Sequence, residues 1–131
     1  MGAWGVGSFQ NDSVMDWVWE LTDRSVVRRT LETVANWDAD EYLEVDESSN
    51  AVGAAEAVAA LIGRPGPELP PEAAEWVTGQ PPGAGEGLVD LAVQALARLE
   101  SNSELQILWD EAEGGPEWHA AIQDLSRRLL G

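Results

Sequence analysis

The sequence predicts an all-α fold, a compact orthogonal bundle of about seven short helices behind a Gly- and Trp-rich N-terminal segment. Apolar residues recur at spacings of three and four along most of the chain, and helix-capping residues precede several of these stretches. No apolar–polar alternation typical of a strand has useful length. Hydrophobic residues make up 44% of the 131 residues, so we expect one core and a single domain over 1–131.

The first half of the chain contains three predicted helices. Ser13 stands before an amphipathic stretch over 14–21, and a second helix is expected over 23–36. The third, over 49–62, is apolar on two faces and therefore belongs in the centre of the fold. That position leaves Glu56 at least partly buried.

The second half begins with two Pro- and Gly-rich loops, 63–71 and 79–87, which bracket a short helix starting near Pro71. Strong helical periodicity then returns. Three further helices are expected, and they begin near Leu88, at the capping residue Ser103 and at Pro116.

Composition and charge exclude several classes of protein. The chain has 24 acidic residues against 7 basic ones, all of them Arg, and a net charge of −17. This balance excludes a nucleic-acid binder and argues against binding to anionic membranes. The absence of Cys excludes disulfides, Cys-ligated zinc, iron–sulfur centres and a thiol nucleophile. Without a membrane-length apolar run or a secretory signal, we expect a cytoplasmic protein.

The opening segment MGAWGVGSFQNDSVMDWVWEL resembles the bacterial family known as domain of unknown function 4259. Similar patches follow at YLEVDESSNAVGAAEAVAALIGRP and in the segment from Ser103 to Trp109, and Gln10 departs from the Glu that the pattern usually has. The resemblance spans nearly the whole chain; it implies a shared fold and leaves the activity open. The matching N-terminal residues are Gly2, Ala3, Trp4, Gly5, Gly7, Phe9, Asn11, Asp12, Asp16 and Trp17.

Enzyme signatures mostly fail, so no catalytic residue is predicted. The Gly5–Gly7 pair lacks the third glycine of a dinucleotide loop, a Walker A motif needs a Lys, and no GxSxG motif is present. An EF-hand at Asp38 fails because Tyr42 and Leu43 stand at required ligand and Gly positions. The single histidine, His119, is expected to lie at the surface or to pack against a tryptophan.

The strongest candidate ligand site combines Asn11, Asp12, Asp16 and Glu56. Asp12 and Asp16 share a helix face, and Glu56 is an acid in an otherwise small, apolar stripe. Together these oxygens would suit a hard cation such as Ca²⁺ or Mg²⁺. In the structural alternative, which we favour, Asn11 and Asp12 cap a helix, and Glu56 accepts backbone hydrogen bonds or pairs with an Arg.

A candidate partner-binding surface lies in the acidic run over 38–47. Trp109 and Trp118 lie on inward stripes and are expected in the core, whereas Trp19 points to the polar side of its helix. The structural alternatives are a solvated acidic face and packing of Trp19 on the N-terminal segment. The candidate residues are Trp19, Asp38, Asp40, Glu41, Glu44, Asp46 and Glu47.

Two function classes follow from these candidates. The first is a non-catalytic interaction module that neutralises or regulates a basic protein partner, for example by masking the basic cleft of a nuclease toxin. The second is a divalent-metal or small-ligand-binding domain, possibly hydrolytic, that uses Asp12, Asp16 and Glu56. We favour the first because the sequence offers no recognisable nucleophile or base. The oligomeric state and the pathway stay open.

Overall fold

The computed structural model describes residues 24–37, 41, 43, 45–66, 71–81, 83, 85–101, 103–111 and 115–130. Within these ranges the chain forms six α-helices and one 3-10 helix, and no strand. The all-α prediction is therefore confirmed for this part of the chain. The elements are α2 (Arg24–Ala35), α3 (Val45–Leu61), α4 (Pro71–Thr78), η1 (Glu86–Leu88), α5 (Val89–Ser101), α6 (Glu104–Glu111) and α7 (Gly115–Leu130).

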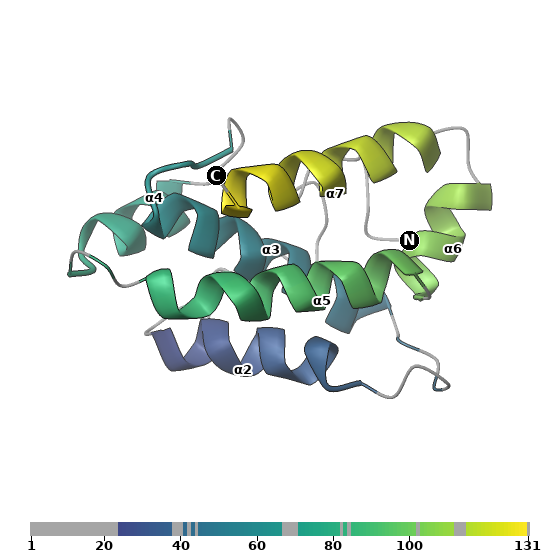
Figure 1. Ribbon diagram of the computed structural model, residues 1–131, viewed down its shortest axis with the longest axis horizontal. Helices are drawn as coiled ribbons and strands as arrows, with labels where there is room; N and C mark the ends of the chain where they lie inside the picture. Colours follow the sequence, from purple (N-terminus) through teal and green to yellow (C-terminus); the bar gives the residue numbers. More distant parts are fainter. Residues whose placement is uncertain are drawn as a thin grey trace.

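Helix α3 forms the centre of the bundle. Every residue from 51 to 60 is buried, as expected for a helix that is apolar nearly all round. Alanine occupies six of these positions, and its small side chain lets the neighbouring helices approach the α3 backbone closely. The other described helices therefore pack around α3 (Figure 1).

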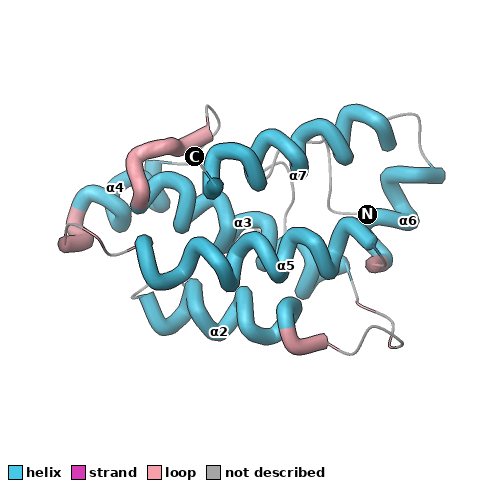
Figure 2. Tube along the Cα trace, viewed as in Figure 1, coloured by secondary structure: helices cyan, strands magenta, loops and turns pink. Residues whose placement is uncertain are grey.

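The long helices α2, α5 and α7 surround α3 and extend along the long axis of the molecule (Figures 1 and 2). They lie lengthwise rather than at right angles to one another. Each contributes a regular apolar stripe to one continuous core. The residues that these three helices bury are Val27, Leu31 and Val34 from α2, Ala92, Ala95, Leu96 and Leu99 from α5, and Trp118, Ile122, Leu125 and Leu129 from α7.

Helix α3 begins at Val45, before the Ser49 that the hydrophobic pattern predicts. The additional turn contains Glu47, whose negative charge suits the positive end of the helix dipole. The acidic run therefore does not end in a loop, because its last residues form the first turn of the central helix.

Helix α6 begins where its cap predicts. The Ser103 Oγ atom accepts a hydrogen bond from the Gln106 backbone N–H at 3.0 Å and donates one to the Leu99 carbonyl at 2.6 Å. Ser103 thus links the last turn of α5 to the first turn of α6. Trp118 is buried and Trp109 packs partly buried against the core, as the sequence predicts.

The predicted helix over 14–21 and the Gly- and Trp-rich N-terminal segment lie outside the described residues. None of the helices that the structure describes combines the length and the apolarity that a membrane crossing requires.

Close packing around α3 can be tested with a single enlarged side chain. Ala55 is fully buried, and we expect Ala55→Leu to lower the free energy of unfolding by about 1–3 kcal/mol through overpacking. Ala97 on α5 is exposed, so Ala97→Leu is the matched control and should change stability little. Urea denaturation measures the free energy of unfolding of each variant. Equal losses in Ala55→Leu and Ala97→Leu would contradict the central position of α3.

Candidate functional site

The acidic segment over 38–47 is the first predicted surface that the structure partly describes. Glu41 is exposed, and Glu47 is half-buried in the first turn of α3. The Oε2 atom of Glu47 is buried and has no hydrogen-bond partner among the residues that the structure describes. Asp38, Asp40 and Glu44 lie outside the described residues, as does the side chain of Asp46.

Arg98 of α5 binds the main chain on both sides of residues 38–40, in the segment that joins α2 to α3. Its Nε atom donates to the Trp37 carbonyl at 3.3 Å, and its Nη2 atom donates to the Glu41 carbonyl at 3.1 Å. One guanidinium thus binds the chain before and after residues 38–40. A cation supplied from α5 therefore helps to position the acidic segment, a role that the sequence does not indicate.

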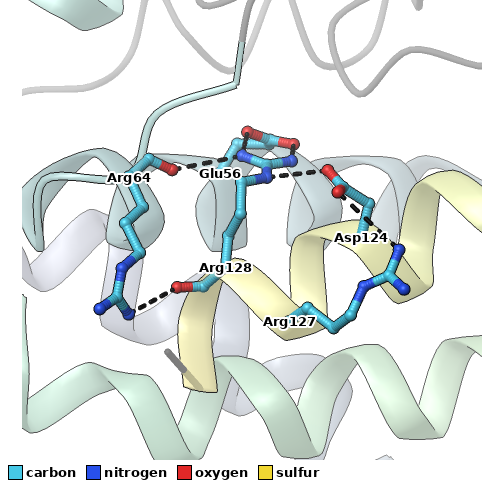
Figure 3. Close-up of polar contacts among 5 residues, drawn as sticks. All are labelled: Glu56, Arg64, Asp124, Arg127 and Arg128. Atoms are coloured by element: carbon cyan, nitrogen blue, oxygen red, sulfur yellow. Dashed lines mark hydrogen bonds and ion pairs between the residues drawn. The ribbon is translucent and has the colours of Figure 1, made fainter.

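Glu56 is buried and paired with Arg128 of α7 (Figure 3). The Nη1 atom of Arg128 donates to Oε2 of Glu56 at 2.9 Å, and Nη2 donates to Oε1 at 2.8 Å. This two-bond geometry is the strong form of a carboxylate–guanidinium pair. The Glu56 side chain is only 5% exposed and that of Arg128 20%, so the pair is largely shielded from water.

Neighbouring groups hold the Arg128 guanidinium and the chain around it. The Nε atom of Arg128 donates to Asp124 Oδ2 at 3.0 Å, one turn earlier on α7. Nη1 also donates to the Arg64 carbonyl at 3.4 Å, and Arg64 donates in return to the Arg128 carbonyl at 3.2 Å (Figure 3). The segment after α3 is therefore tied to the end of α7.

Gly66 lies directly against the same pair. A Cβ atom at this position would stand 2.9 Å from Glu56 Oε2 and 3.1 Å from Arg128 Nη1. Because any side chain would press on the ion pair, only glycine lets the backbone pass this close.

This arrangement decides what Glu56 can do chemically. The hydrogen bonds from the guanidinium to the Glu56 carboxylate raise the pKa of Arg128 above its already high value, so the cation is permanent. A cation at Glu56 would have to displace this guanidinium. Pairing with an Arg, one of the structural alternatives predicted for Glu56, is present in the structure. Asn11, Asp12 and Asp16, the other predicted ligands, lie outside the described residues, as does Trp19.

His119 has two carboxylate partners, which the sequence did not indicate. Its Nδ1 atom lies 3.0 Å from Glu100 Oε2 of α5, and its Nε2 atom lies 2.7 Å from Asp110 Oδ1 of α6. The hydrogen bond to Glu100 is the main cause that raises the pKa of His119, and Asp110 adds to it against the opposing effect of burial. The pKa of Asp110 is lowered by hydrogen bonds from Gln106 and then from His119. His119 also packs edge-on against Trp118, as the sequence predicts.

Comparison with known proteins identifies the family. The family model described as a domain of unknown function (DUF4259) matches residues 2–121. The chain belongs to the DUF4259 family. The match confirms the resemblance of the N-terminal motif and its extent along the chain. Neither the curated proteins nor the solved structures contain a match to this chain.

The DUF4259 match covers some of these contacts and not others. Glu56 and the cluster of Glu100, Asp110 and His119 lie inside the matched range, whereas Arg128 lies beyond its end. No group of three or more His, Asp or Glu side chains suited to a metal ion lies in the described part of the DUF4259 domain.

Because Arg128 pairs with Glu56, removing its side chain should destabilise the domain far more than removing that of the adjacent Arg127. Arg128→Ala leaves a buried carboxylate unpaired, so we expect a loss of roughly 3–5 kcal/mol in the free energy of unfolding. Arg127 is 76% exposed and meets only Asp124, at 4.0 Å, so Arg127→Ala is the matched control and should cost less than about 1 kcal/mol. Urea denaturation compares them, and similar losses would refute the structural importance of the pair.

A divalent cation test addresses the predicted ligand site directly. Because Glu56 is already bound by Arg128, we expect millimolar Ca²⁺ or Mg²⁺ to leave the melting temperature unchanged. A cation that bound only the folded state would raise it. A rise that Glu56→Gln abolishes and that Asp124→Asn leaves intact would instead support a metal site at Glu56.

Proposed function

We propose that this domain is a non-catalytic interaction module whose acidic surface binds a basic protein partner. The distribution of charge in the structure carries the proposal. In the part of the chain that the structure describes, the arginine side chains are held by contacts within the domain, whereas several exposed carboxylates have no ion pair.

The domain has far fewer positive charges than negative ones, and all of the positive side chains are arginines apart from His119 when it is protonated. Each arginine side chain that the structure describes contacts a carboxylate or a main-chain carbonyl of the domain itself. Three of them, Arg64, Arg98 and Arg128, join segments far apart in the sequence. These cations stabilise the fold and are not available to neutralise the rest of the surface.

Several other exposed carboxylates make no ion pair within the described part of the chain. Four of them belong to α4, η1 and the first turn of α5, and α4 and the start of α5 lie at the same end of the bundle (Figure 1); we call these four residues the acidic end. It is anchored to α3, because a Cβ atom on Gly85 would stand only 2.7 Å from the Leu61 side chain. The acidic end consists of Glu72, Glu75, Glu86 and Asp90, each exposed and without an ion pair in the described part of the chain.

Acidic side chains continue at other exposed positions. Glu41 lies on the segment that Arg98 holds, and Glu111 and Glu117 flank the turn between α6 and α7. A surface with one dominant sign of charge attracts a partner of the opposite sign and accelerates its association. It also repels nucleic acids and other acidic proteins, which restricts the choice of partner to basic proteins.

The test compares two sets of charge-removing substitutions. One variant carries Glu72→Gln, Glu75→Gln, Glu86→Gln and Asp90→Asn at the acidic end, and the other carries Asp38→Asn, Asp40→Asn, Glu41→Gln and Glu44→Gln in the acidic segment. A partner is captured from host lysate, purified, and its association rate measured at several salt concentrations. We expect the variant that lacks the contacted charges to associate at least about tenfold more slowly.

Gln94→Ala, an uncharged exposed position on α5, is the control and should bind as the unmodified chain does. Thermal unfolding of each variant separates loss of contacts from loss of fold. A captured partner that is not basic, or a rate that neither salt nor either set of substitutions changes, would overturn the proposal.

A further inference from the structure

Three helices meet at the single histidine of the chain. Glu100 comes from the last turns of α5, Asp110 from the end of α6, and His119 from the first half of α7. The side chains are partly exposed, at 28%, 41% and 30% respectively, so protons exchange freely with solvent. No described side chain of α3, the other helix packed against α6 and α7, forms a hydrogen bond or ion pair with the ring.

The number of protons on the imidazole decides whether both contacts are favourable. An ionised carboxylate only accepts hydrogen bonds, and a neutral imidazole has one N–H and one bare nitrogen. Both contacts are therefore hydrogen bonds only when the ring is a cation with two N–H groups. Removal of that proton leaves a nitrogen lone pair against a carboxylate oxygen at one of the two contacts.

Helix α6 has only 8 residues, and the cluster is one of its described attachments. The others include the Ser103 cap at its start, the partly buried Trp109, and the close approach of Gly115 to the Trp109 carbonyl. Asp110 lies in its last turn, where the negative end of the helix dipole repels a carboxylate. The protonated ring and Gln106 offset that repulsion.

We propose that His119 is a proton-dependent clasp that holds the end of α6 against α5 and α7 and releases it when the ring loses its proton. The clasp consists of Glu100, Asp110 and His119. Of the other charged groups nearby on α7, Glu117 is exposed and makes no ion pair, so the two clasp carboxylates are the ones that act on the ring.

The direction of the pH effect follows from the two titrating partners. Because the pKa of His119 is raised in the folded state, its stabilising contribution is complete below the unperturbed value of about 6.5 and is lost as pH rises through the folded-state pKa. Because the pKa of Asp110 is lowered, its contribution is complete above about pH 4 and is lost as pH falls through the folded-state pKa. The clasp is therefore closed in mildly acidic solution and opens on the alkaline side.

The experiment uses the full chain and two readouts. Because the chain has one histidine, its imidazole proton resonance in NMR reports the titration of His119 without assignment of other rings. We expect a midpoint above about 6.5, lowered by Glu100→Gln and by Asp110→Asn and unchanged by the control Glu117→Gln. A midpoint at or below the unperturbed value would overturn the proposal.

Amide hydrogen exchange, corrected for the intrinsic rate at each pH, reports release of the helix. Above the midpoint we expect protection of 104–111 to fall by about tenfold or more relative to that of α5. In His119→Gln the protection of α6 relative to α5 should be low at every pH. If the protection of α6 relative to α5 stays constant as the unmodified chain is titrated, the charged ring does not hold α6.

Discussion

Burial of an ionised glutamate inside the central helix is the constraint on which the rest of the fold depends. The neighbours of Glu56 on α3 are small and apolar, and the helix gains its stability by being covered on every side. A carboxylate in that position is costly unless a cation and hydrogen bonds accompany it. Arg128, 72 residues later, supplies both. The Glu56–Arg128 pair therefore links the burial of α3 to the docking of α7.

Other arginines also stabilise contacts between distant segments, and the domain has few of them. The chain has only 7 arginines against 24 acidic residues, and three of them join segments far apart in the sequence. Arg98 binds the main chain at Trp37 and Glu41, and Arg64 and Arg128 hold the end of α3 to the end of α7. These three cations stabilise the fold, and Arg64 does so from an exposed position.

The helices could be predicted from sequence, because apolar spacing and the Ser103 cap are local signals. The burial of Glu56 could also be predicted, since one acid interrupts an otherwise apolar stripe. Its partner could only be described as an arginine, because nothing local to Glu56 points to Arg128, which lies 72 residues later on another helix. The carboxylate partners of His119 could not be predicted for a similar reason. Its partners come from two other helices, and local spacing contains no information about pairs that the tertiary structure brings together.

The two ends of α7 differ in a way that follows from the chemistry of their cations. Near the C-terminal end Arg128 stays charged at any pH the protein meets, so the attachment to α3 is constant. Near the N-terminal end the cation is an imidazolium, which is charged over only part of that range. A change of pH therefore acts on α6 while the Glu56–Arg128 pair keeps α3 and α7 together. The titrating contact and the buried one lie on different turns of α7, so a change in the charge of His119 leaves the Glu56–Arg128 pair in place.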